Sequence, residues 1–260
     1  MTGAGLQLVD THCHLDVSEF DADRDEVIAR ARAAGVQQMV VPAVDAAHWE
    51  GLVALCNSYT GLYPALGMHP VYWQQHRPEH LRALAEAIET WRPVAVGEIG
   101  LDFFIPEADR EVQRQLLAAQ LDIARDAGLP VILHVRKAHD EVLSMLRRHR
   151  VKGGIAHAFN GSLQQADAYL GLNFRLGFGG MLTYDRSRKI RALAKALPMQ
   201  AIVLETDAPD MTVASHHGQR NSPEYLPECL QALAEVREEA PELLAQQSSD
   251  NARDVLGLPR

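Results

Sequence analysis

Six residues that can bind metal ions or exchange protons follow the ends of short apolar runs in this sequence. They are His12, His14, Glu98, His134, His157 and Asp207. His12 and His14 are separated by a single residue. Because residues i and i+2 of an extended chain share a face, both imidazoles can point at one ion. The spacing of this pair therefore fits a metal site as well as it fits two hydrogen-bonded core histidines.

Six donors are more than one ion would use, since a tetrahedral zinc needs only three or four protein ligands. The set therefore favours two divalent cations. Imidazole and carboxylate ligands suit zinc, magnesium, manganese, iron or nickel, and the ligand list does not select among them. Two ions about 3.5–4 Å apart would hold and deprotonate a water and stabilise the attacked and leaving oxygens. A carboxylate such as Glu98 could bridge them, because each of its oxygens can take one ion.

Several other residues of metal-binding type are expected to be ordinary. A lone buried histidine is more often a hydrogen-bonded core residue than a ligand. Cys13 stands between His12 and His14, so the pleat turns it to the opposite face, and we expect a buried, inert thiol. His216 and His217 lie in a polar stretch and are expected to be solvated. Only the coincidence of six residues after separate apolar runs supports a metal centre.

The elements that must position these residues alternate along the chain. Strands are expected at residues 6–10, 36–41, 62–68, 94–97, 129–135, 154–159, 174–178 and 201–206. Helical patterns cover residues 21–34, 46–58, 78–91, 107–127, 162–170, 185–197, 225–239 and 249–256. Strands that alternate with helices imply a parallel sheet covered by helices. Eight units in about 250 residues predict a (β/α)₈ TIM barrel, whose active site lies at the carboxyl ends of the strands.

The alternative architecture is an open, doubly wound sheet. Its first strand-to-helix turn is typically rich in glycine and cradles phosphate. Here that turn runs from Thr11 to Asp16 and contains no glycine. No linker or repeat divides the sequence, so we expect a single α/β domain over residues 1–260.

The chain carries 34 acidic and 25 basic residues, a net charge of −9. This net charge argues against a protein that binds nucleic acid through long-range electrostatic attraction, although it allows a local basic patch. Three widely spaced cysteines suggest neither a disulfide framework nor a thiolate zinc site. The start lacks the features of a signal peptide, and no apolar stretch is long enough to span a bilayer. We therefore expect a cytoplasmic protein without a membrane or an obligate protein partner.

Taken in order, the motifs resemble those of the TatD family of metal-dependent deoxyribonucleases. The similar segments are Asp10-Thr-His12-Cys-His14-Leu, Gly67-Met-His69-Pro, Gly97-Glu98-Ile-Gly-Leu-Asp102, His134-Val-Arg136, His157-Ala-Phe-Asn-Gly, Leu204-Glu-Thr-Asp207-Ala-Pro, Arg220-Asn221-Ser-Pro223-Glu-Tyr225-Leu-Pro227 and Asn251-Ala-Arg. The resemblance covers essentially the whole chain. It implies an amidohydrolase-like TIM barrel whose divalent-metal centre hydrolyses phosphodiester bonds in DNA.

The resemblance also implies roles for individual residues. His12, His14 and Asp207 are expected to bind one metal. His134 and His157 are expected to bind the second, with Glu98 shared between the two ions. Asp207 would also orient or deprotonate the attacking water, so the expected catalytic residues are Asp207 and Glu98. Glu205 is either a further ligand or a buried partner of a metal-binding histidine.

The same resemblance points to substrate-binding residues. His69 and Arg136 are expected at the rim, where Arg136 could contact a phosphate through two hydrogen bonds. Asn221 and Tyr225 lie beyond the last strand and are expected to touch the same ligand. Arg220 either joins them or serves as a structural ion-pair partner.

The expected function is a metal-dependent phosphodiesterase, most simply a DNA exonuclease acting on single-stranded or frayed ends. A protein of charge −9 must attract a polyanion locally, so we expect weak, salt-sensitive DNA binding. One alternative is hydrolysis of a small cyclic amide, lactone, ester or phosphoester on the same barrel, because loops set the substrate. A second alternative is a non-enzymatic barrel that keeps metals for stability.

Overall fold

The computed structural model describes residue 5 and residues 7–260. Its sheet consists of β1 (Leu8–Asp10), β2 (Val36–Pro42), β3 (Leu62–Leu66), β4 (Ala95–Asp102), β5 (Val131–Arg136), β6 (Gly154–Ala156), β7 (Phe174–Phe178) and β8 (Ile202–Leu204). Each strand pairs in parallel with the next along the chain, in the order β1 to β8. Beyond β1, the Thr11 N–H donates to the Leu204 carbonyl at 3.1 Å, which brings the last strand to the first. The predicted TIM barrel is confirmed.

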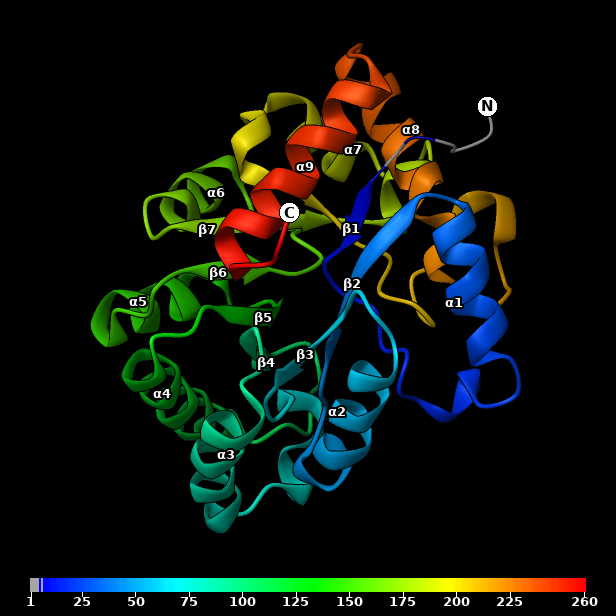
Figure 1. Ribbon diagram of the computed structural model, residues 1–260. Helices are drawn as coiled ribbons and strands as arrows, with labels where there is room; N and C mark the ends of the chain where they lie inside the picture. The colour runs from blue at the N-terminus through cyan, green and yellow to red at the C-terminus, as the bar shows by residue number, and fades with distance from the viewer. Residues whose placement is uncertain (1–4, 6) are drawn as a thin grey trace.

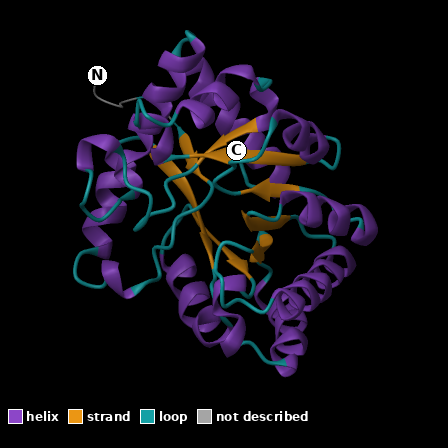
Figure 2. Ribbon diagram, turned by 180° about the vertical axis from the view of Figure 1, so that it is seen from behind, coloured by secondary structure: helices purple, strands orange, loops and turns teal. Residues whose placement is uncertain are grey.

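Helices alternate with the strands and surround the barrel (Figures 1 and 2). They are α1 (Arg24–Ala33), α2 (Trp49–Ser58), α3 (Pro78–Trp91), α4 (Arg110–Ala127), α5 (His139–His149), α6 (Leu163–Leu170), α7 (Arg188–Ala196), α8 (Leu226–Arg237) and α9 (Pro241–Leu256). Among the described residues, no helix combines the length and the apolar character needed to cross a bilayer.

Most bounds differ from the expected ranges by a few residues, three elements differ more, and Leu6 of the first expected strand lies outside the described residues. The expected helix ranges leave out α5, and α9 begins at Pro241 rather than at residue 249. Strand β4 continues to Asp102 instead of ending at Gly97. Its glycines are not strand breakers: a Cβ on Gly100 would lie 1.9 Å from the His134 carbonyl oxygen. Glycine is needed at this position because β4 and β5 approach closely.

The amino ends of the strands enclose an apolar layer. Seven strands each contribute one buried residue to a single cluster: Val9, Val40, Ala65, Ala95, Ile132, Ile155 and Val203. Val255, Leu256 and Leu258 pack into the same cluster from α9 and the segment that follows it. In Figure 1, α9 lies in front of the strands, across this end of the barrel. Figure 2 shows loops gathered over the opposite end.

Candidate metal centre

The polar site lies one step along the strands from the apolar layer. His134, His157 and Glu205 each follow an inward apolar residue of that layer by two positions. Because side chains alternate between the two faces of a strand, a residue two positions further along points to the same side. The same alternation of side chains therefore buries apolar residues at the amino end of the barrel and directs these polar groups into its carboxyl end.

Glu98 lies at the centre of the site and is only 1% exposed. Its Oε2 is 2.9 Å from His12 Nε2 and 3.6 Å from His14 Nε2. Its Oε1 is 3.2 Å from His69 Nε2 and 3.1 Å from His134 Nδ1. The two oxygens of one carboxylate thus face two separate pairs of histidines, as a bridging ligand would require.

His12 and His14 converge as their spacing predicts, with their Nε2 atoms 3.2 Å apart. The His14 Nδ1 lies 3.1 Å from the Pro42 carbonyl oxygen. A carbonyl only accepts, so Nδ1 carries the proton in this contact, and Nε2 is the ring nitrogen directed into the site. The Asp207 Oδ1 lies 3.7 and 3.8 Å from the Nε2 atoms of His12 and His14. Its backbone has a left-handed φ of 58°, a sparsely populated conformation that recurs at functional sites.

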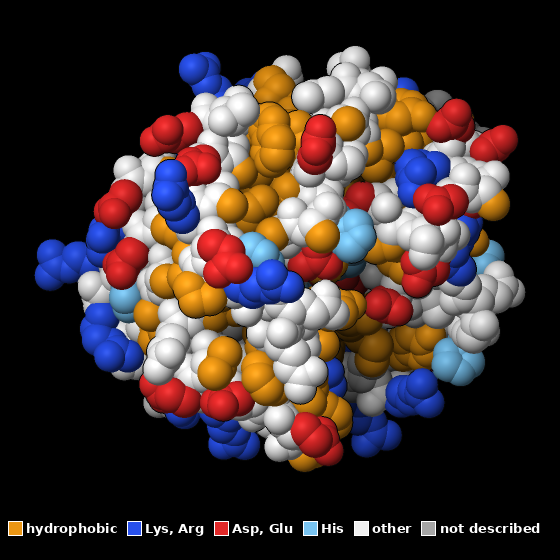
Figure 3. Space-filling view, turned by 90° about the horizontal axis from the view of Figure 1, so that it is seen from below, with side chains coloured by type: hydrophobic (Ala, Val, Ile, Leu, Met, Phe, Trp, Pro, Cys, Tyr) orange, Lys and Arg blue, Asp and Glu red, His pale blue; other side chains and the backbone are white. Residues whose placement is uncertain are grey.

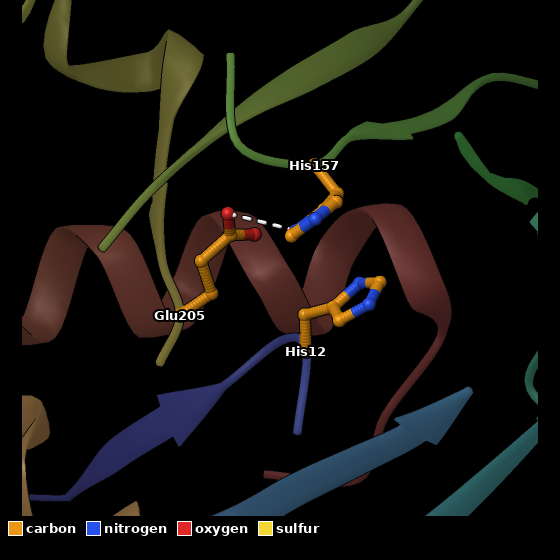
Figure 4. A group of neighbouring side chains, drawn as sticks. All are labelled: His12, His157 and Glu205. Carbon is orange, nitrogen blue, oxygen red and sulfur yellow. Dashed lines mark ion pairs between the residues drawn. The ribbon is translucent and has the colours of Figure 1, made fainter. Parts of the chain in front are cut away.

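His157 and Glu205 form the inner wall of the site, beside His12 (Figure 4). The His157 ring stacks on His12 with centroids 3.8 Å apart, and its Nε2 is 3.7 Å from Asp207 Oδ2. The Glu205 Oε1 is 3.0 Å from His157 Nδ1 and accepts the Ala158 N–H at 2.6 Å. A Cβ on Gly177 would lie 2.1 Å from the Glu205 carboxylate, so only glycine leaves room for it.

Two further acids, Asp102 and Asp10, support the site, although no role was assigned to them from the sequence. Asp102 Oδ2 is 2.9 Å from His134 Nε2, and this contact orients the ring whose other nitrogen faces Glu98. Asp10 accepts from the backbone N–H and the hydroxyl of Thr206, which ties the end of β1 to the end of β8. Asp10 precedes His12 by two residues and Asp102 follows Glu98 by four, and that proximity to candidate ligands is the signal the sequence offers.

The buried charges shift one another's pKa. Burial favours the neutral form of Glu98, but the surrounding histidines, His12 foremost, outweigh it and hold the pKa of Glu98 well below its ordinary value. For His157, burial acts to lower the pKa, while Glu205 and then Asp207 raise it to about 10. Burial dominates at His69 and lowers its pKa to about 4. His69 is therefore a neutral ring beside an ionised carboxylate.

A cavity of about 710 Å³ opens over these groups. His14, His69, His134, His157 and Asp207 are among the residues that line it. Its wall also includes Arg136, so two of the expected substrate-binding residues, His69 and Arg136, do border the space above the site. His69 additionally contacts Glu98, which places it deeper than a rim residue.

The other two expected substrate-binding residues occupy different positions. Asn221 is 1% exposed, and its amide donates to the carbonyls of Thr206 and Asp210, so it fixes the loop after β8 instead of facing a ligand. Tyr225 is not among the cavity residues and stacks on His216, with ring centroids 4.0 Å apart. Sequence position alone could not distinguish a loop that contacts substrate from one that supports such a loop.

Arg220 and Cys13 fit their structural interpretations. The Arg220 guanidinium forms two hydrogen bonds with the Asp23 carboxylate, at 2.8 and 2.7 Å, and lies over the Phe20 ring. Cys13 is fully buried, and burial raises the pKa of its thiol well above its ordinary value. Neither side chain is directed at the metal-binding groups.

The arrangement of donors fits divalent cations. Within the described residues, three groups bring their ligand atoms within 4.8 Å of one another: His12–His14–Glu98, His69–Glu98–His134 and His12–His157–Glu205. The buried Glu205 Oε2 and His12 Nδ1 have no hydrogen-bond partner. Burying unpaired polar atoms costs free energy, which a bound cation would offset. His134 lies closer to His69 than to His157, with ring centroids 4.4 and 6.5 Å apart.

Comparison with known proteins agrees with this geometry. YjjV of Escherichia coli K12, described as an uncharacterized metal-dependent hydrolase, is 40% identical over 257 residues, covering 97% of this chain and 99% of YjjV. Its crystal structure superposes with a TM-score of 0.92 over 97% of this chain and 98% of that chain. A Klebsiella pneumoniae protein named 3′-5′ ssDNA/RNA exonuclease TatD is 33% identical over 96% of this chain and 98% of its own length.

The family model described as TatD related DNase matches residues 9–257, a range that contains β2 to β8, all of β1 except Leu8, and every group of the candidate centre described above. With its TIM barrel and its histidines and acids at the carboxyl ends of the strands, the chain belongs to the TatD family of metal-dependent hydrolases.

Proposed function

We propose that this protein is a two-metal phosphodiesterase that removes nucleotides from the ends of single-stranded DNA. The position of Glu98 carries the proposal, because its two carboxylate oxygens face different histidine pairs. One cation would be held by His12, His14 and Asp207, and the other by His134 and His157, with Glu98 shared. His69, the second histidine that faces Glu98 Oε1, would lie beside the second cation. The name of the Klebsiella relative supports the choice of substrate.

Bound cations would supply an acidified water and neutralise charge on the phosphate oxygens. Asp207 would take the proton of the attacking water. Its carboxylate borders the cavity and is more exposed than that of Glu98, the other acid among the proposed ligands. The water oxygen forms the new bond to phosphorus as the bond to the leaving nucleoside oxygen breaks. Arg136 would contact the non-bridging phosphate oxygens from the cavity wall.

Glu205 would act on His157 as a positioning residue. Its Oε1 is 3.0 Å from Nδ1, and the charge of the carboxylate would hold the ring with Nε2 directed toward Asp207. Histidines that bind metals typically donate their second nitrogen to such an acid. The contact with the Ala158 N–H holds the acid in place.

The surface charge is consistent with weak and local DNA binding. Figure 3 shows acidic and basic side chains interspersed over the face seen from below, rather than one broad basic surface. A protein of net charge −9 then relies on bound cations and a few local side chains to attract a polyanion. Affinity should therefore be weak and should decrease as salt is raised.

The direct test combines elemental analysis with a reconstituted nuclease assay. Metal-stripped protein is reloaded separately with Zn²⁺, Mg²⁺, Mn²⁺, Fe²⁺ or Ni²⁺ and given single-stranded DNA, duplex DNA, and a panel of small esters, lactones, cyclic amides and phosphoesters. The proposal predicts metal-dependent release of nucleotides, fastest from single strands. Turnover of a small ester or amide without any nucleotide release would overturn it.

A further inference from the structure

Phe104 is a large, exposed apolar side chain that contacts Arg136, a residue of the cavity wall. It follows β4 by two residues and is 52% exposed, whereas its neighbour Phe103 is 9% exposed. Single exposed apolar side chains are common on protein surfaces and need no explanation by themselves. What distinguishes Phe104 is its surroundings, which combine positive charge with a rigid connection to the proposed metal centre.

Two cations lie over the Phe104 ring. The Arg136 Cζ is 4.3 Å and the Lys137 Nζ is 4.8 Å from the ring centroid. Both residues are exposed, and Arg136 also borders the cavity. A ring with adjacent cations combines a stacking surface with groups that attract phosphate. In a chain of net charge −9, this is a local exception to the overall acidic balance.

Asp102 connects the Phe104 backbone to the candidate centre. The Phe104 N–H donates to Asp102 Oδ1 at 2.9 Å, and Asp102 Oδ2 is 2.9 Å from His134 Nε2. The same carboxylate also lies 3.5 Å from Arg136 Nη1. Asp102 thus fixes the backbone of Phe104 and the guanidinium of Arg136 relative to His134.

A second exposed aromatic side chain, Tyr72, lines the cavity itself. Tyr72 belongs to a short 3₁₀ segment, Pro70–Gln75, is 40% exposed and has its ring 5.8 Å from that of His69. Buried Gln113 joins its segment to the end of β4: it accepts the Asp102 N–H at 2.9 Å and donates to the Pro70 carbonyl at 3.2 Å. The loops that carry Phe104 and Tyr72 are therefore fixed to each other.

We propose that Phe104, supported by Arg136, Lys137 and Tyr72, is a stacking platform for the unpaired bases next to the scissile phosphate. This inference rests on the proposed nuclease function. Base stacking on aromatic rings tolerates any sequence, because every base has a π face, and nearby cations hold the backbone. The platform makes single strands the preferred substrate, since a duplex keeps those base faces stacked within the helix.

The test compares two substrates of equal backbone charge. One is a short single-stranded DNA, and the other is the same strand with abasic residues at both ends. Phe104→Ala should lower kcat/KM on the normal strand by about 10-fold, as expected for loss of one base-stacking contact. On the abasic strand the variant should match the wild type, and Phe104→Tyr should restore activity on the normal strand.

Leu243→Ala is the matched control, because Leu243 is a similarly exposed apolar residue (47%) on α9, away from the cavity. It should behave as wild type on both strands. Equal activity of Phe104→Ala and wild type on the normal strand would overturn the platform, as would an equal loss on both strands. If wild-type protein hydrolyses neither strand with any metal, the proposed nuclease function itself fails, which is a different outcome from loss of the platform alone.

Discussion

The two ends of the barrel are made by the same strands but hold opposite kinds of side chain. At the amino end, inward residues such as Ile132 and Ile155 are fully buried and pack against α9. Two positions further along the same strands stand His134 and His157, beneath an open cavity. Residues two positions apart thus stabilise the fold at one end of the barrel and form the polar site at the other. The two ends should therefore respond separately to mutation.

The largest expected effect is at the carboxyl end. Asp207→Asn removes both a proposed metal ligand and the proposed proton acceptor, so kcat should fall by about 10³–10⁴-fold. Circular dichroism and the thermal midpoint of the metal-free protein should stay near the wild-type values, because the barrel packing is untouched. Asp185→Asn, at an exposed position, is the control and should leave kcat unchanged. Undiminished turnover by Asp207→Asn would contradict the assigned role.

The amino end should show the converse behaviour. Leu256→Ala truncates a side chain that is 4% exposed and packed into the apolar layer, so the free energy of unfolding should drop by about 2–5 kcal/mol. Urea denaturation measures the loss. Activity per folded molecule should not change, and a large fall in kcat would mean that the two ends are coupled. Leu243→Ala, on the exposed face of the same helix, should cost less than about 0.5 kcal/mol.

The fold and the convergence of the candidate ligands at one end of the barrel could be predicted because they depend on periodicity and on residue type at strand ends. The limit of β4 could not, because Gly97 and Gly100 resemble strand breakers until β5 is seen to approach them. The role of Asn221 was also inaccessible. An amide in a loop after the last strand can face a ligand or cap the loop's own carbonyls, and only tertiary contacts distinguish the two.

A smaller effect is expected at Glu205, which contacts the proposed ligand His157. Glu205→Gln keeps the shape of the side chain but removes the charge that holds His157, so metal affinity should fall by about 10–100-fold. Isothermal titration of the stripped protein measures this directly. Unaltered metal affinity with unaltered kcat would show that Glu205 does not position His157.

The smallest effects are expected for substitutions of Arg220 and Arg136. Arg220→Ala breaks a partly exposed ion pair with Asp23, so stability should change by less than about 1 kcal/mol and KM for DNA should not change. Arg136→Ala should raise KM, because its guanidinium borders the cavity. A rise in KM for Arg220→Ala would return Arg220 to the substrate-binding set.

Anomalous diffraction from metal-loaded crystals tests the central claim most directly, because it counts and positions the ions without relying on turnover. The proposed centre predicts two ions about 3.5–4 Å apart at the carboxyl end of the barrel, with one Glu98 oxygen on each. A single ion at full occupancy, or ions that leave Glu98 without a metal contact, would contradict a two-metal centre built around that carboxylate.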